Sequence, residues 1–190
     1  MTNDEWMTVA RNIENVASNW SGGSVGLGSI NWGHTDNSPA NSLAANSDDT
    51  QACEGTEQTC SDTVWSTQRR THVLSNGEVI WDFSGNVGDW IDWTVVTDKA
   101  SPQFAAIEIN TTTPTTAMPQ ASYFPENASY DSSHGIGRYY PGEDGSGGIA
   151  FRGGYWLDSG YAGVFALSLN SSSWSMSNGI GFRCAWSPGG

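Results

Sequence analysis

The spacing of apolar positions predicts one amphipathic helix at the start of the chain. Thr2 stands three residues before Glu5, which is the spacing of a capping box at a helix N-terminus. The apolar positions that follow recur at three- and four-residue intervals and share one helical face: Trp6, Val9, Ala10 and Ile13. We therefore expect a helix that begins after Thr2 and packs this face on a core.

Short apolar runs predict strands in the rest of the chain. The stretch 71–81 holds two such runs on either side of Asn76-Gly77, a strong signal for a β-hairpin turn. Residues 90–96 alternate apolar with polar, as a strand with one buried face does. Further strands are predicted at 149–152, 163–167 and 180–183. Because 163–167 is apolar on both faces, we expect it inside a sheet.

Two long stretches, 18–64 and 97–148, are rich in turn-forming residues and predict loops. The first is polar and dominated by Gly, Ser, Asn and Asp, which indicates a loop insertion held in place by Trp20 and Trp32. The second contains most of the prolines. The whole pattern predicts an α+β fold in a single domain over residues 1–190.

Composition and charge exclude two classes of partner. The formal net charge is −13 and Lys99 is the only lysine, so the chain lacks the basic cluster that nucleic-acid binding requires. An anionic membrane surface would repel it, and no run of about 18 apolar residues is present to insert into a bilayer. We expect no nucleic-acid partner and no membrane insertion.

The three cysteines lie in two different settings. Cys53 and Cys60 share one polar loop and can close a small disulfide in an oxidising compartment. Cys184 follows the apolar run 180–183, and we expect it to be a buried, unreactive thiol.

Four stretches resemble motifs of one superfamily, in chain order. They are residues 2–11 (TNDEWMTVAR), 82–90 (DFSGNVGDW), 151–156 (FRGGYW) and 179–184 (GIGFRC). Together they resemble the formylglycine-generating-enzyme branch of the C-type lectin fold. The resemblance implies short antiparallel strands, one or two helices and long ordered loops. Since the family has earlier strands that are not found here, we expect the chain to begin inside a longer protein.

A narrower resemblance covers residues 152–185, which contain AGVFALSLN at 162–170. This stretch is similar to the variable region of diversity-generating-retroelement target proteins. In that family a reverse transcriptase copies a template with errors at adenines, and the copy overwrites the 3′ end of a gene for a lectin-fold binding protein. The resemblance implies a receptor-binding protein, on a virus particle or a cell surface, with a protein or glycan partner and no required cofactor. The alternative is a non-diversified carbohydrate-binding or adhesive domain.

An oxidase of the formylglycine type is the less favoured interpretation. That branch uses two cysteines for copper and thiol chemistry, shortly after a Gly-Gly-Ser motif. Placing Gly153-Gly154 on that motif puts Asp158 and Gly163 near the two positions, and neither side chain has a sulfur for copper ligation. We therefore expect no enzymatic activity.

The resemblance also implies a structural calcium site, with Asn86 and Asp89 as oxygen ligands. Asp is one methylene shorter than the Glu of the family motif, and Gly88 stands where the family has Trp. The alternative is a turn in which Asn86 takes a left-handed or side-chain-bonded conformation.

The stretch 155–177 has the composition of a binding surface, because Tyr, Trp, Ser, Gly and Asn dominate it and charge is nearly absent. We expect Tyr155 and Tyr161 to be aromatic anchors, and Trp174 to rank below them. The candidate contact residues are Tyr155, Leu157, Asp158, Ser159, Tyr161, Ser168, Ser171, Ser172, Trp174, Met176 and Ser177. The expected framework is Trp156, Val164, Phe165, Leu167, Leu169, Ile180 and Phe182. The alternative is a serine-rich surface loop with a few exposed aromatics.

Overall fold

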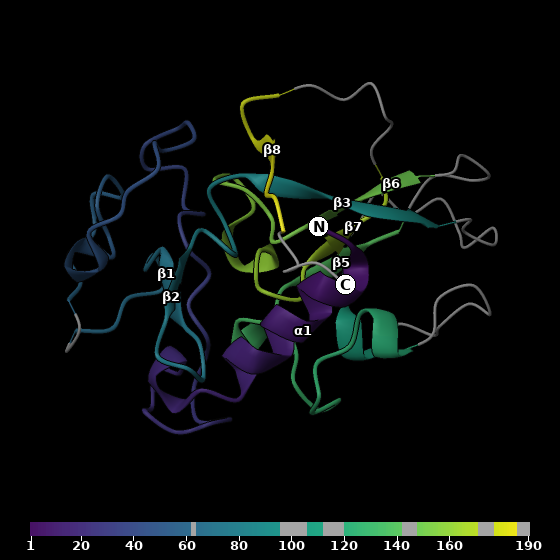
Figure 1. Ribbon diagram of the computed structural model, residues 1–190, viewed down its shortest axis with the longest axis horizontal. Coiled ribbons are helices and arrows are strands. Elements are labelled where there is room, and N and C mark those ends of the chain that lie inside the picture. The colour runs from purple at the N-terminus through teal and green to yellow at the C-terminus, as the bar shows by residue number, and fades with distance from the viewer. Residues whose placement is uncertain (62–63, 96–105, 112–119, 142–147, 171–176, 186–190) are drawn as a thin grey trace.

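The residues that the structure describes form one α-helix and two β-sheets, so the chain is an α+β protein (Figure 1). The structure is a computed structural model, and it describes residues 1–61, 64–95, 106–111, 120–141, 148–170 and 177–185. Short 3-10 turns complete the regular elements: η1 (Ala17–Asn19), η2 (Asp49–Gln51), η3 (Ile109–Thr111), η4 (Gln120–Ser122), η5 (Ser132–His134) and η6 (Ser159–Tyr161). Within these ranges no helix is long and apolar enough to cross a bilayer.

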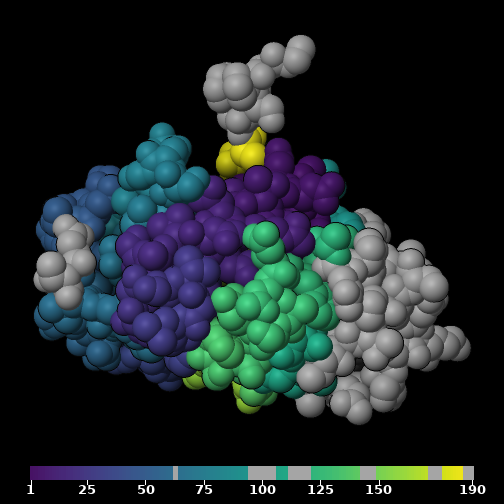
Figure 2. Space-filling view, turned by 90° about the horizontal axis from the view of Figure 1, so that it is seen from below, coloured from purple at the N-terminus to yellow at the C-terminus, as the bar shows by residue number. Residues whose placement is uncertain are grey.

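The helix α1 (Asn3–Glu14) forms as its sequence predicts. Thr2 and Glu5 cap each other reciprocally, which confirms the capping box. Trp6 stacks on Phe83 at 4.0 Å between ring centroids, and its indole N–H donates to the carbonyl of Val164 at 2.8 Å. The last turn of α1 lies against the 120–141 segment, where the Glu14 carboxylate accepts from two backbone amides (Figure 2).

The predicted hairpin is also confirmed, as β1 (Thr71–Val73) paired with β2 (Val79–Trp81). Its turn is tightened by a hydrogen bond from Gly77 N to Leu74 O, and Gly77 has φ +86°. A side chain at this φ is strained, so the glycine of Asn76-Gly77 is the residue that the turn requires.

The second sheet has six strands in the order β4-β5-β7-β6-β3-β8. The bounds are β3 (Gly88–Val95), β4 (Ile107–Glu108), β5 (Arg138–Tyr140), β6 (Gly148–Arg152), β7 (Leu167–Ser168) and β8 (Ile180–Phe182). The pairs β3–β8 and β5–β7 are parallel, so the expectation of antiparallel strands is only partly correct. The stretch 97–148 was predicted as loop, yet it supplies β4 and β5.

The strand predicted at 163–167 is wrong for its first four residues, because β7 begins only at Leu167. Gly163 to Ala166 form a turn instead, closed by a hydrogen bond from Ala166 N to Gly163 O. Gly163 lies so close to the backbone of Ile136 that a Cβ there would be 2.3 Å from its carbonyl carbon. Val164 and Phe165 are fully buried, so this segment is apolar because the turn is in the core. β7 itself lies inside the sheet, as expected.

The C-terminal strand is less buried than its sequence suggests. Phe182 is 76% exposed and Cys184 is an exposed free cysteine, so the expectations of a core ring and a buried thiol are both wrong. Ile180 and Trp156 are half-buried rather than fully buried. The reason is that β8 is an edge strand that pairs only with β3, which leaves its other side open.

The loop insertion 18–64 has little regular structure in the part described, as predicted, and it is anchored at several points. Cys53 and Cys60 form a disulfide. Trp20 is buried and donates to Glu14 O, whereas Trp32 is half-buried. The Arg70 guanidinium reaches the loop carbonyls of Glu54 and Ala44 while it pairs with Asp82 at 2.7 Å. Charge-assisted hydrogen bonds therefore hold this loop to the hairpin.

A buried arginine joins the helix, the sheet and two loops. Arg152 ends β6 and is fully buried, and its guanidinium donates to Asn3 Oδ1, Ser122 O and Phe165 O at 2.6–3.2 Å. Burial, with a smaller effect from the charge of Arg11, lowers the pKa of Arg152 to about 9. The group therefore remains a cation at neutral pH, held by polar groups from three other parts of the chain.

We predict that Arg152→Lys lowers the free energy of unfolding by about 3 kcal/mol, measured by urea denaturation. The lysine ammonium group cannot reach all three acceptors that the planar guanidinium of Arg152 bridges. At least one of these buried oxygen atoms would therefore lose its hydrogen-bond donor. Arg11→Lys is the control, because Arg11 donates to the carbonyl of Ala121 in an exposed position, and we expect it to cost less than about 1 kcal/mol. Equal effects of the two variants would contradict the role given to Arg152.

Candidate functional site

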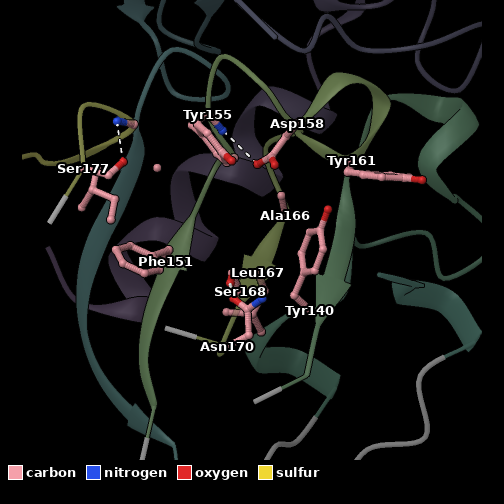
Figure 3. A pocket seen from close by; sticks show the side chains of 14 residues that line it. Tyr140, Phe151, Tyr155, Asp158, Tyr161, Ala166, Leu167, Ser168, Asn170 and Ser177 are labelled. Atoms are coloured by element: carbon pink, nitrogen blue, oxygen red, sulfur yellow. Dashed lines mark hydrogen bonds between the residues drawn. The ribbon is translucent and has the colours of Figure 1, made fainter. Parts of the chain in front are cut away.

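One pocket of about 370 Å³ lies on the sheet face that is opposite the core (Figure 3). On β5 the side chains alternate, so buried Tyr139 contacts Tyr123 in the core while Tyr140 points to the pocket side. The pocket is lined by Gly88, Tyr140, Phe151, Gly154, Tyr155, Asp158, Tyr161, Ala166, Leu167, Ser168, Asn170, Ser177, Gly179 and Ile180. Its walls therefore come from β5, β6, β7, the loop after β6 and the segment before β8.

Two glycines turn the chain from β6 into the upper wall of the pocket. Gly153 and Gly154 have φ +86° and +76°, and a Cβ on Gly154 would lie 2.6 Å from the Cβ of Ala162. Only glycine fits such a close approach with positive φ. The loop is then held from outside, because Trp156 N donates to Asn86 O and Ser159 N donates to Thr35 O. This tight turn explains why Tyr155 and Asp158 face the pocket.

Three tyrosines from two segments surround the cavity. Tyr140 and Tyr161 meet edge to face, with ring centroids 6.2 Å apart. The Arg138 guanidinium lies over the Tyr161 ring at 4.6 Å from its centroid and pairs with Glu108 at 2.7 Å. Tyr161 is 43% exposed and Tyr155 is half-buried. Aromatic groups of this exposure supply large contact areas at low entropic cost.

Among the described residues that line the pocket, Asp158 is the only acidic one. One carboxylate oxygen, Oδ2, accepts from Tyr155 N at 3.0 Å (Figure 3). Burial raises the pKa of Asp158 to about 6, against the smaller lowering effect of that hydrogen bond. Burial and then the charge of Asp158 raise the pKa values of Tyr140 and Tyr155, so both phenols are neutral at physiological pH. The pocket thus holds one desolvated carboxylate among neutral hydroxyl groups.

The side of the pocket opposite the tyrosines is lined by small polar residues and glycine. Ser168 Oγ donates to Asn170 Oδ1 at the end of β7, and Ser177 Oγ accepts from Gly179 N at 2.9 Å. Gly88 N donates to Gly179 O, which holds the segment before β8 against the start of β3. A bound molecule would meet hydroxyl and amide groups on this side and aromatic rings on the other.

The structure brings together five of the predicted contact residues, which are Tyr155, Asp158, Tyr161, Ser168 and Ser177. Leu157 and Ser159 are exposed beside the pocket but do not line it. Ser171, Ser172, Trp174 and Met176 lie outside the described residues.

Sequence reasoning missed the pocket residues that come from strands, above all Tyr140, Phe151 and Asn170. The alternation of Arg138, Tyr139 and Tyr140 could have indicated a strand with Tyr140 on its outer side. No local signal could have shown that this strand pairs with β7, because the two are far apart in sequence.

The two residues suggested for calcium are held by other parts of the chain. Asn86 has φ +61°, and its side chain accepts from Leu43 N and donates to Leu43 O and Asp82 Oδ2. Asp89 is buried and pairs with Arg183 at 2.7 Å. These contacts favour the alternative, a turn in which Asn86 is left-handed and side-chain-bonded. In the part of the chain that is described, no group of three or more His, Cys, Asp or Glu residues gathers as metal ligands.

Comparison of the chain with family models, curated proteins and solved structures finds no match.

We predict that Asp158→Asn stabilises the protein more at pH 8 than at pH 5. The raised pKa means that the carboxyl favours the folded state below about pH 4 and loses this contribution as the pH rises through about 6. The variant stays neutral, so its advantage in unfolding free energy should grow by about 1 kcal/mol over this interval.

Urea denaturation at several pH values measures this difference. Burial lowers the pKa of His72 to about 4, which gives the opposite slope: its contribution is lost as the pH falls from about 6.5. The comparison must therefore be made between two variants that both retain His72. Glu78→Gln in the exposed hairpin turn removes the same charge and should run parallel to the unmodified protein. An Asp158→Asn curve that is also parallel would refute the assignment.

Proposed function

We propose that this chain is a non-catalytic ligand-binding protein of the retroelement-diversified type, with a C-type lectin fold. The observation that carries the proposal is the pocket itself. Five contact residues chosen from the 155–177 composition line one cavity on one face of the sheet, although they come from a loop, a strand end and a second loop. A serine-rich surface loop without function would not require such convergence.

The positions of the resembling motifs support the fold proposal. The stretch 82–90 leads into β3, the stretch 151–156 leaves β6, and 179–184 contains β8. β3 pairs with both β6 and β8, so the three stretches lie side by side in the sheet. Gly85 N donates to Gly153 O, which joins the first two directly. Motifs that resemble one family and meet in space are more specific than the same motifs read separately.

The division between framework and contact residues suits a variable site. Val164, Phe165, Leu167 and Leu169 are almost fully buried, whereas Leu157, Ser159 and Tyr161 are exposed. Exchange of the exposed set would change recognition without opening a cavity in the core. The partner we propose is a protein or glycan receptor. The Cys53–Cys60 disulfide favours a virion surface or a cell exterior as the location.

A second candidate is a non-diversified carbohydrate-binding domain. It is favoured by the combination of exposed Tyr161 with a carboxylate and hydroxyl groups in one pocket, since sugars bind to aromatic faces and hydrogen-bonding groups. An oxidase is disfavoured by chemistry, because Asp158 and Gly163 occupy the places where thiolates would be needed.

We predict that several of the candidate contact residues can be randomised at once without loss of the fold. In a displayed library with five randomised contact positions (Tyr155, Leu157, Ser159, Tyr161 and Ser168), we expect about half or more of the clones to resist proteolysis as the parent does. Selection on one immobilised protein, streptavidin, should enrich binders at least about a hundredfold. Surface positions cost little when changed, whereas core positions cost several kcal/mol.

A second library, randomised at five buried positions, is the control: Ala150, Val164, Phe165, Leu167 and Leu169. We expect only a few per cent of these clones to be protease-resistant. The DNA beside the gene gives an independent test, since a reverse-transcriptase gene and a near-copy of codons 152–185, different at adenines, should be present. An intolerant contact library, or the absence of such a copy, would contradict diversification, and a glycan array would then test the carbohydrate alternative.

A further inference from the structure

We infer that the pocket takes an organic ammonium group on a short apolar stem, such as an alkylamine or a lysine side chain. This inference rests on the proposed function, because it assigns a ligand class to the same pocket. It follows from three features of the cavity: a carboxylate with a free oxygen, a set of tyrosine rings, and an apolar floor.

The first feature is a carboxylate, Asp158, that forms no ion pair with any residue in the described ranges. Asp158 Oδ2 accepts one hydrogen bond, from Tyr155 N, while Oδ1 has no partner among the described residues. Arg138 is the cation that packs against the tyrosines, and it is already paired with Glu108 at 2.7 Å and stacked on Tyr161. Removing a carboxylate from water without a neighbouring cation costs free energy. A cationic ligand would offset part of this desolvation cost.

The second feature is aromatic. Tyr140, Tyr155 and Tyr161 line the same cavity as the carboxylate, and Tyr161 already accepts one cation on its ring. A desolvated ammonium group is attracted to the faces of such rings, and aromatic cages bind alkylated ammonium ions in this way. The phenols of Tyr140 and Tyr155 remain neutral below about pH 8 because burial raises their pKa values, so these two groups do not compete for the cation.

The third feature separates an organic cation from a metal ion. Phe151, Ala166 and Ile180 line the pocket and can cover a chain of methylene groups. A hard metal ion needs several oxygen ligands, and in the part of the chain that the structure describes Asp158 is the single carboxylate that lines the pocket. Ser168, Asn170 and Ser177 supply neutral oxygen atoms that can accept from the ammonium N–H groups. The net charge of −13 also attracts cations toward the molecule.

The test is an NMR titration of the ¹⁵N-labelled intact chain with n-butylammonium chloride at pH 7.5, with sodium chloride held at equal ionic strength. We expect saturable shifts of the Tyr155, Gly154 and Gly179 amides with a dissociation constant of about a millimolar. The neutral analogue n-butanol should bind at least tenfold more weakly. Equal shifts with both compounds, or none with either, would overturn the inference.

Substitutions in the pocket test which side chains contribute to n-butylammonium binding. Asp158→Asn should weaken n-butylammonium at least tenfold, whereas the matched charge variant Glu78→Gln should leave it within twofold. Tyr161→Leu should weaken it several-fold, and Tyr161→Phe should restore it because the ring is retained. Loss of binding in Glu78→Gln as well would show a non-specific charge effect and contradict the site.

Lowering the pH to 5 should weaken n-butylammonium binding at least fivefold, because protonation removes the Asp158 charge. The titratable groups beside this carboxyl are Tyr140 and Tyr155, and burial raises both of their pKa values, so neither phenol ionises between pH 5 and 7.5. The Tyr161 ring is directed away from Asp158, with the Arg138 guanidinium over that ring (Figure 3). The Asp158→Asn variant should show no such pH dependence. A retained dependence in that variant would place the titrating group elsewhere.

Two further comparisons show whether the ammonium group comes from a protein side chain or from a free amine, and whether a negative result contradicts the ligand class or the proposed function. Nα-acetyl-lysine-methylamide should bind at least as tightly as n-butylammonium if the natural ligand is a protein side chain, and more weakly if it is a small free amine. If the contact library binds streptavidin but n-butylammonium shifts nothing, the ligand class is wrong and the proposed function stands. If both experiments fail, the proposed function itself is wrong.

Discussion

The guanidinium of Arg152 is the constraint that the rest of the structure depends on. Its donors reach the first turn of α1, the 3-10 turn η4 and the turn before β7, so groups distant in sequence must meet at one buried cation. Hydrophobic burial would allow these segments many arrangements, but five directional donors allow few. β6 ends at this residue, and the glycines that follow turn the chain toward the pocket. The geometry of the site therefore begins in the core.

Local sequence signals located the elements that depend on near neighbours. The capping box of α1, the turn at Gly77 and the apolar run of β6 each involve residues close in sequence, and each was predicted. The turn at 163–166 misled the pattern analysis because a buried turn and a buried strand are equally apolar. β5 was missed because it is short and lies in a proline-rich stretch, and its pairing with β7 has no local signature.

The residues of the candidate site could also be predicted only where the signal lies in the local sequence. Composition was sufficient to find Tyr155, Asp158 and Tyr161, since a stretch of Tyr, Ser and Gly with almost no charge is unusual in a folded domain. It gave no indication that Asp158 is half-buried in a pocket wall, because its exposure depends on which strands pass beneath the loop. The exposure of Phe182 and Cys184 was also beyond composition, since an edge strand and an internal strand can have the same sequence.

Tyr140 gives the pocket an asymmetry with an evolutionary consequence. It lies on β5, outside the stretch 152–185, so under the proposed diversification it would be inherited unchanged while its neighbours across the cavity would be exchanged. Every variant of the site would then contain the same phenol ring, that of Tyr140. Ligands that contact this ring would then be over-represented among those that the variants bind, and Phe151, which also lies outside 152–185, would be a second constant contact.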